Sequence, residues 1–323
     1  MLLVGGAILF NGWPSGLIGT APRDVELVYD YPASHEDFPA IASHYPATRI
    51  RAYRFVLRHQ EAFNLDVVDY LDDGGRQHHA IAYLDPVSSP STAVRAAFDI
   101  RTLRYRAWRD ALAFIKAEVP PDALVVTWWD NAQRIHFMSG RSMWIEAPVL
   151  SAMGMAEREF WRPLFAGSES GDDRNRLLAR WLAMDAGTAV SEFAKYFNRD
   201  VYIVVTLDDL ARLGEIKSLA GRRIPLVSKS FAVGGDFHGA IAQVKRWAGE
   251  GVSGNYLLRD FPGYGVQAWR VENAQGADSL LVKLLPFTDS VAHPPSDLEV
   301  LYRSGDGAYL SVYRWQSPRH NND

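Results

Sequence analysis

One strand–helix–strand segment constrains the fold of this chain more than any other feature. Ala80–Asp85 (AIAYLD) and Leu124–Trp129 (LVVTWW) are apolar runs typical of buried strands, and residues 93–118 between them have a helical pattern. Pro120 and Pro121 end the helix before the second run begins. A strand, a helix and a strand at this spacing predict a parallel crossover and therefore an α/β fold.

Other segments predict further parts of the same fold. We expect strands at Glu26–Tyr31, Met143–Val149 and Val201–Thr206, and helical structure in Ile50–Phe63 and across residues 157–197. We also expect a short helix at Gln133–Met138 that is closed by Ser139 and Gly140. The sequence therefore predicts a mostly parallel sheet flanked by helices. In sheets of this kind, ligands usually bind at the carboxyl ends of the strands.

The character of the sequence changes beyond Pro225. Short β-rich runs alternate with glycine turns there, at residues 252–258, 266–271, 280–285, 298–302 and 308–313, and the last two flank a hairpin turn at Ser304–Gly307. We divide the chain into an N-terminal segment (residues 1–20), an α/β domain (residues 21–224) and a β-rich C-terminal part (residues 225–318). The C-terminal part is expected to pack on the same core.

The first residues read MLLVGGAILFNGWPSGL and carry no charge before Arg23. Asn11 and Pro14 interrupt this run, which is short for a complete membrane span, so we interpret it as one hydrophobic anchor that resembles the end of a truncated span. A cleaved signal peptide normally has a positive leading region, which is missing here, and a buried first strand or helix is the other alternative. With a single anchor in the inner membrane, we expect the rest of the chain to lie in the periplasm.

Composition excludes several classes of protein. None of the 323 residues is cysteine, which excludes disulfides, zinc–thiolate sites, iron–sulfur clusters and covalently attached haem. The formal net charge of -4 gives no broad cationic field for a nucleic acid. We therefore predict no cofactor and no nucleic-acid partner.

The densest group of chemically versatile side chains lies between Pro120 and Arg141. Tryptophan offers an aromatic platform, aspartate and asparagine accept hydrogen bonds, and arginine holds carboxylates or phosphates with two donors. The candidate ligand- or partner-binding residues are Trp128, Trp129, Asp130, Asn131, Arg134 and Arg141. The structural alternative places tryptophan in the core, uses Asp130 as a helix cap and pairs Arg141 with Glu146.

Signals for catalysis are absent from the sequence. His78 and His79 are adjacent and so point apart on a strand, while His136, His238 and His293 have no metal-ligand spacing. The chain contains no HExxH motif, no GxSxG nucleophile elbow and no phosphate-binding P-loop. Paired acids such as Asp72 and Asp73 occur in turns, where they serve capping and solubility. We therefore predict no catalytic residue and no metal site, and favour a binding protein over an enzyme.

The stretch TWWDNAQRIHFMSGR resembles the WWD region in the soluble domain of oligosaccharyltransferase catalytic subunits. Trp128, Trp129 and Asp130 match that motif, which in the family helps to recognise the acceptor peptide. Asn131 and Ala132 replace the family's usual aromatic residue and glycine, and the transmembrane helices that carry its catalytic acids are missing. The resemblance implies a related fold and argues against glycosyl transfer.

Over its whole length, the chain resembles the HaoB family of hydroxylamine oxidation proteins. The N-terminal anchor, the WWDNAQRI-x-x-x-SGR block and the β-rich tail carry this resemblance. The family occurs beside the multihaem hydroxylamine oxidoreductase of ammonia- and methane-oxidising bacteria, which is thus an expected partner. It implies a membrane-anchored accessory protein that binds a partner or ligand; the alternative is a glycan- or peptide-binding domain related to oligosaccharyltransferases.

Overall fold

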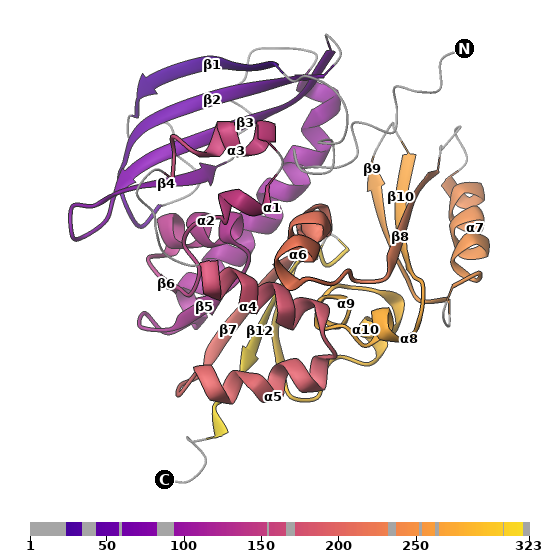
Figure 1. Ribbon diagram of the computed structural model, residues 1–323. Coiled ribbons are helices and arrows are strands. Elements are labelled where there is room, and N and C mark those ends of the chain that lie inside the picture. Colours follow the sequence, from indigo (N-terminus) through magenta and orange to yellow (C-terminus); the bar gives the residue numbers. More distant parts are fainter. Residues whose placement is uncertain are drawn as a thin grey trace. The chain divides into compact units, whose positions relative to one another are not determined.

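The computed structural model describes residues 24–33, 43–57, 60–82, 94–153, 155–165, 172–231, 237–251, 254–261, 265–305 and 307–318 (Figure 1). The predicted N-terminal anchor lies outside these residues. Within the described ranges, no helix is both long enough and apolar enough to cross a bilayer. These residues form two compact units, an N-terminal unit of residues 24–175 with 202–204 and a C-terminal unit of residues 176–201 with 205–318.

A four-stranded antiparallel sheet opens the N-terminal unit. Its strands follow each other in space as in sequence, β1 (Asp24–Pro32), β2 (Ala47–Leu57), β3 (Gln60–Leu71) and β4 (Gln77–Ala82). The predicted helix at Ile50–Phe63 is therefore wrong, because residues 50–57 and 60–63 form parts of β2 and β3. Ile50 is buried while its neighbours Arg49 and Arg51 turn to the other face, and this two-residue period belongs to a strand.

The predicted helix at residues 93–118 is confirmed as α1 (Val94–Glu118), but the parallel crossover around it is wrong. β4 pairs antiparallel with β3, whereas β5 (Leu124–Val126) pairs in parallel with β6 (Ser142–Met143) in another sheet. The described pairs are mostly antiparallel, so the predicted mostly parallel sheet is wrong and the fold is mixed α/β. The pattern of elements left the partner of each strand open, and β4 found its partner across a hairpin.

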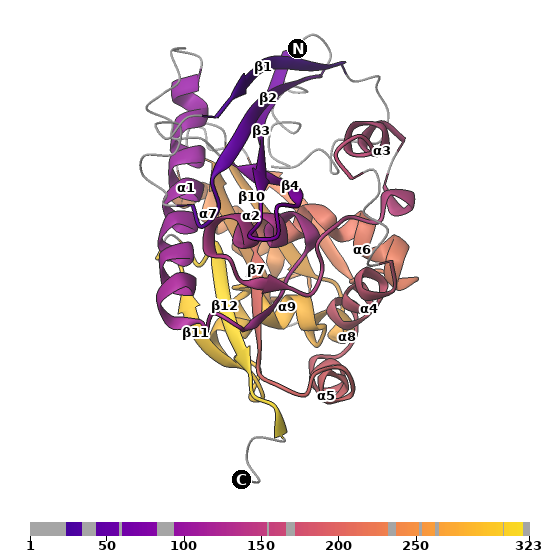
Figure 2. The ribbon, with the colours of Figure 1, turned by 90° about the vertical axis from the view of Figure 1, so that its left-hand side faces the viewer.

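Helix α2 (Trp129–Ser139) follows β5 directly and carries most of the predicted site residues. The predicted end of this helix is confirmed, since Gly140 closes it with a left-handed φ of 69°. A Cβ at Gly140 would also lie 2.5 Å from the His44 ring, so this position requires glycine for two reasons. α2 packs against β4, and both views show it next to that strand (Figures 1 and 2).

The remaining elements complete the two units. They are η3 (Leu150–Ala152), α3 (Met155–Trp161), α4 (Asp172–Ala183), α5 (Ala186–Tyr196), β7 (Val201–Thr206), η4 (Leu207–Arg212), α6 (Leu213–Ala220), β8 (Leu226–Phe231), α7 (Phe237–Ala248), β9 (Tyr256–Phe261), β10 (Gly265–Val271), α8 (Ala274–Ala277), α9 (Leu280–Leu284), α10 (Thr288–Ala292), β11 (Glu299–Arg303) and β12 (Leu310–Trp315). Two sheets have the strand orders β8-β10-β9 and β11-β12-β7-β5-β6.

Sequence patterns beyond residue 200 were informative to different degrees. The predicted strand at residues 201–206 is confirmed as β7, and the hairpin around Ser304–Gly307 is confirmed by the antiparallel pairing of β11 with β12. The predicted strand at residues 280–285 is wrong, because residues 280–284 form helix α9. The buried residues of this helix are Leu280, Leu281, Val282 and Leu284, and such a short, mostly apolar run gives no period by which helix and strand can be told apart.

Candidate functional site

All six residues that we predicted as a binding site lie in the interior of the N-terminal unit. Their exposed fractions range from 0% for Trp129 to 7% for Arg141. The structure brings them together along α2 and at its two ends, but it presents no open aromatic platform there. A binding role stays a prediction for these six residues, Trp128, Trp129, Asp130, Asn131, Arg134 and Arg141.

The first turn of α2 is held by aromatic packing. Trp129 meets the rings of Trp161 and Phe165 edge to face, with centroids 5.2 and 5.8 Å away. The Oδ1 atom of Asp130 accepts a hydrogen bond from the backbone N–H of Asn131 at 3.0 Å. A carboxylate in the first turn also interacts favourably with the positive end of the helix dipole.

The two arginines of this segment donate to backbone carbonyls. Arg134 Nε donates to the carbonyl oxygen of Ile81 at 3.1 Å, and its guanidinium lies 4.4 Å from the centroid of the Trp108 ring. Arg134 therefore ties α2 to β4 and to α1.

Arg141 secures the end of α1. Its Nη2 atom donates to the carbonyl oxygens of Val119 and Lys116 at 2.8 and 2.9 Å, and Nη1 donates to that of Ser139 at 2.8 Å. Burial lowers the pKa of the Arg141 guanidinium. Carbonyls at a helix C-terminus lack partners within the helix, so Arg141 supplies what this helix end needs, in place of the pairing with Glu146 that we considered.

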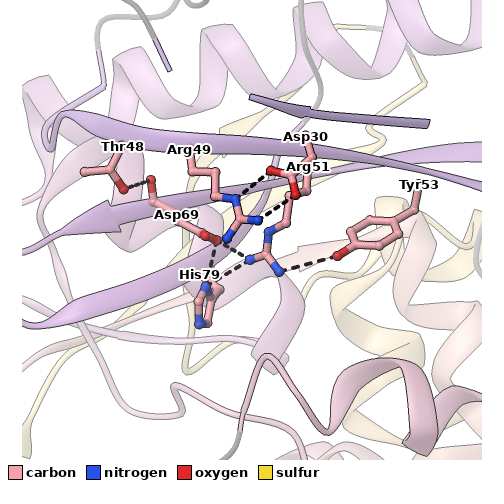
Figure 3. A network of polar contacts seen from close by, with 7 residues as sticks. All are labelled: Asp30, Thr48, Arg49, Arg51, Tyr53, Asp69 and His79. Atoms are coloured by element: carbon pink, nitrogen blue, oxygen red, sulfur yellow. Dashed lines mark hydrogen bonds and ion pairs between the residues drawn. The ribbon is translucent and has the colours of Figure 1, made fainter. Parts of the chain in front are cut away.

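Polar side chains that the sequence did not single out form a network on the four-stranded sheet, here called the outer network. It consists of Asp30, Thr48, Arg49, Arg51, Tyr53, Asp69 and His79 (Figure 3). At its rim, Arg49 donates from Nε and Nη2 to the two carboxylate oxygens of Asp30, both at 2.6 Å. The two side chains are 50% and 31% exposed, so this fork-shaped ion pair is presented to solvent.

Asp69 is the centre of the outer network. Its buried carboxylate accepts from Arg51 Nη2 and, at 2.8 Å, from Nδ1 of His79, which lies directly opposite it on β4. Burial opposes ionisation, but the hydrogen bonds from His79 and Arg51 outweigh it and hold the pKa of Asp69 below its ordinary 3.8. Asp69 is therefore an anion at neutral pH that neutralises Arg51 and orients the His79 ring.

The contact with Asp69 fixes the tautomer of His79. A carboxylate only accepts, so Nδ1 carries the proton and Nε2 keeps its lone pair in the neutral ring. Figure 3 shows this second nitrogen turned away from the dashed contacts. The side chain is 22% exposed, so the outer network offers solvent a hydrogen-bond acceptor beside the charges of Arg49 and Asp30.

A second group of rings and one carboxylate, here called the inner network, consists of Tyr45, Tyr70, Asp72, His78 and His136. The prediction that His78 and His79 point apart is confirmed, because Nε2 of His78 contacts Oδ2 of Asp72 at 3.0 Å whereas Nδ1 of His79 contacts Oδ1 of Asp69 at 2.8 Å. The other oxygen of Asp72 accepts from the backbone N–H groups of Gly74 and Arg76, as expected of a turn acid. Hydrogen bonds, that from the Arg76 backbone foremost, hold the pKa of Asp72 well below its usual range.

The rings of the inner network come from separate segments. Tyr70 stacks on Tyr45 and on His78, with centroids 5.5 and 5.4 Å apart. His136, from α2, lies 5.5 Å from His78, and its Nδ1 is 3.0 Å from the carbonyl oxygen of Arg141. Burial lowers the pKa of His136, so this ring is neutral at physiological pH. Sequence spacing could not reveal this pair, because 58 positions separate the two histidines along the chain. The packing of α2 on β4 brings them together.

Comparisons with known proteins identify the family. No curated protein sequence matches the chain significantly. Among solved structures, the chain is similar to the C-terminal globular domain of an oligosaccharyltransferase from Archaeoglobus fulgidus, with 15% identity over 65% of this chain and 97% of that one. The TM-score is 0.32, which is too low to support any conclusion from this likeness. The family model for the HaoA-associated protein HaoB matches residues 1–315. The chain therefore belongs to the HaoB family, whose members are associated with hydroxylamine oxidation.

Proposed function

We propose that this chain is an accessory protein of hydroxylamine oxidation. It binds HaoA, the hydroxylamine oxidoreductase, and performs no catalysis of its own. The family's description as HaoA-associated supports the choice of partner. The observation that carries the proposal is the outer network, whose Arg49–Asp30 ion pair is exposed and held in place on a continuous sheet.

The outer network suits a protein partner for a geometric reason. Arg49 and Asp30 are exposed but held by each other, and the neighbouring Arg51 and His79 are anchored by buried Asp69. Charges held in advance lose little conformational freedom when a partner binds. Such a pattern contributes to specificity and to the rate of association more than to raw affinity.

The same residues offer less to a reaction. His79 and Asp69 have the arrangement of a base and its orienting acid, but within the described part of the chain no hydroxyl contacts His79. The hydroxyl of Thr48 is used in a hydrogen bond to the carbonyl oxygen of Asp69 at 3.0 Å. Without a nucleophile beside the base, covalent catalysis has no starting point. A binding role accounts for this geometry without requiring a nucleophile.

We further propose that the chain is anchored by its N-terminal apolar segment in the inner membrane and faces the periplasm. The run MLLVGGAILFNGWPSGL supports this, because it is uncharged over its whole length. A protein held there would meet a partner of the same compartment at high effective concentration, so even a weak docking surface would suffice. The membrane attachment is tested by whether the full chain sediments with membranes and is released by detergent but not by salt.

Reversing the charge of Arg49 is expected to weaken binding to HaoA by about tenfold, which corresponds to about 1.4 kcal/mol. The substitution Arg49→Glu removes an exposed positive group and places a like charge beside Asp30. The measurement is a titration of purified HaoA against the immobilised chain at low and high salt. The loss should shrink at high salt, because exposed charges are screened.

The matched control is Arg223→Glu, since Arg223 is 63% exposed and pairs with Glu272 at 2.8 Å much as Arg49 pairs with Asp30. It should leave binding unchanged. The double variant Asp30→Arg with Arg49→Asp swaps the two charges and so restores the ion pair between β1 and β2. Its stability should therefore recover, while its binding to HaoA should stay weak. Equal affinity of Arg49→Glu and the unaltered chain, or the absence of binding by the unaltered chain, contradicts the proposal.

A further inference from the structure

Two imidazole rings of the inner network are each fixed on one side by an oxygen acceptor. The carbonyl of Arg141 accepts from Nδ1 of His136, and the carboxylate of Asp72 accepts from Nε2 of His78, so both of those nitrogens carry the protons. The remaining nitrogens, Nε2 of His136 and Nδ1 of His78, keep their lone pairs. Neither has a hydrogen-bond partner among the described residues.

This arrangement is the one that metal-binding histidines adopt. A ligating imidazole almost always donates its second N–H to a carboxylate or a backbone carbonyl, which fixes the ring and increases its basicity. Here one histidine has each kind of acceptor. An ordinary structural histidine needs only one such bond, but two neighbouring rings with both lone pairs unused form a set of donors.

The spacing of the rings fits one shared ion. A metal lies about 2.0 Å from an imidazole nitrogen and the ring centre lies about 1.1 Å behind it, so two rings on one ion have centroids about 5 to 5.5 Å apart at ordinary angles. The His78 and His136 centroids are 5.5 Å apart, with the ring planes inclined by 62°. The centroid spacing of the two rings therefore matches that of two imidazoles bound to one ion.

The surroundings favour a cation in a further way. The carboxylate of Asp72, which contacts His78, contributes a negative charge from the second coordination shell. The His78 side chain is 24% exposed, which leaves access for an ion from solvent.

We propose that His78 and His136 together bind one late first-row divalent metal ion, copper(II) or zinc(II). The described residues contain no group of three or more His, Cys, Asp or Glu side chains that could hold a metal. The protein therefore supplies two nitrogen ligands and solvent supplies the others, which leaves open coordination positions. Imidazole suits both ions. Because the affinity of divalent first-row metals follows the Irving–Williams order, copper should bind more tightly than zinc. This inference does not depend on the docking proposal.

The direct test is titration of the tag-free protein with copper(II), zinc(II) or magnesium(II), followed by X-ray absorption spectroscopy of the loaded protein. We expect one equivalent of copper or zinc, no response to magnesium, and a spectrum that contains two imidazole ligands. A spectrum with no imidazole or only one overturns the proposal, and it does so without any variant.

Substitutions locate the site. His78→Ala and His136→Ala should each weaken metal binding by at least about tenfold, and Asp72→Asn should weaken it about 10- to 100-fold through the second shell. The matched control is His293→Ala, because His293 is exposed and also contacts a carboxylate, Asp289, at 3.1 Å. Circular dichroism identifies any variant that fails to fold, and such a variant is replaced by the corresponding glutamine. Equal metal binding by folded His78→Ala and by the control overturns the proposal.

Discussion

Replacing Trp129 by alanine is expected to lower the free energy of unfolding by about 3 to 5 kcal/mol. The side chain is fully buried and packs edge to face on Trp161 and Phe165, so its removal loses apolar burial and leaves a cavity that these rings cannot fill without moving. The measurement is urea denaturation followed by circular dichroism, with the midpoint and slope fitted for the unaltered chain and the variant.

The control for this prediction is Met155→Ala, because Met155 is 77% exposed and its truncation should change stability by less than about 0.5 kcal/mol. The outcome separates two readings of the WWD segment. A Trp129→Ala variant with a nearly unchanged midpoint and lost partner binding would support the open binding platform that the sequence suggested. A large loss of stability supports the interior role.

Replacing Asp69 by alanine is expected to cost about 3 kcal/mol at neutral pH. The substitution leaves Arg51, whose side chain is only 12% exposed, without the carboxylate that neutralises it, and removes the acceptor that orients His79. We expect the low end of the range for a broken buried pair, because Arg51 and His79 keep partial access to water. Chemical denaturation at neutral pH measures the difference, and Asp30→Ala in the exposed pair should have a much smaller effect.

The same variant predicts a pH dependence with a definite sign. The folded state holds the pKa of Asp69 below 3.8, so the contribution of this group to stability is complete above that value and is lost as the pH falls through the lower, folded value. The stability difference between the unaltered chain and Asp69→Ala should thus shrink as the pH falls from about 5 to below about 4. A difference that grows over this acid range contradicts the assigned ionisation.

The sequence determined the local structure wherever its signals were local. Pro120 and Pro121 ended a long helix, Gly140 ended the next one, and the turn at Ser304–Gly307 made a hairpin, because each acts through the dihedral angles of its own backbone. The opposite directions of His78 and His79 also follow from a single strand. These features were predicted, and the structure confirms them.

Pairing partners were not local, and the sequence left them open. The segment from Ile50 to Phe63 fits a helical pattern when read alone, but residues 50–57 and 60–63 form parts of β2 and β3, which pair with each other in the fold. A strand's hydrogen bonds are satisfied by another segment, so its sequence indicates that a partner is needed and not which one it is. For this reason the predicted parallel sheet gave way to hairpins.

The candidate sites depended almost entirely on tertiary structure. The sequence identified the WWD segment as rich in chemistry, and packing placed those side chains in the interior. Asp69 contacts His79 because the strand register places the two residues opposite each other. His136 lies beside His78 because α2 packs on β4. Composition and local pattern determined which side chains were present and which way each strand turned them. Which side chains lie in contact was decided by the burial of apolar surface. This burial is non-directional and acts between segments that are distant along the chain.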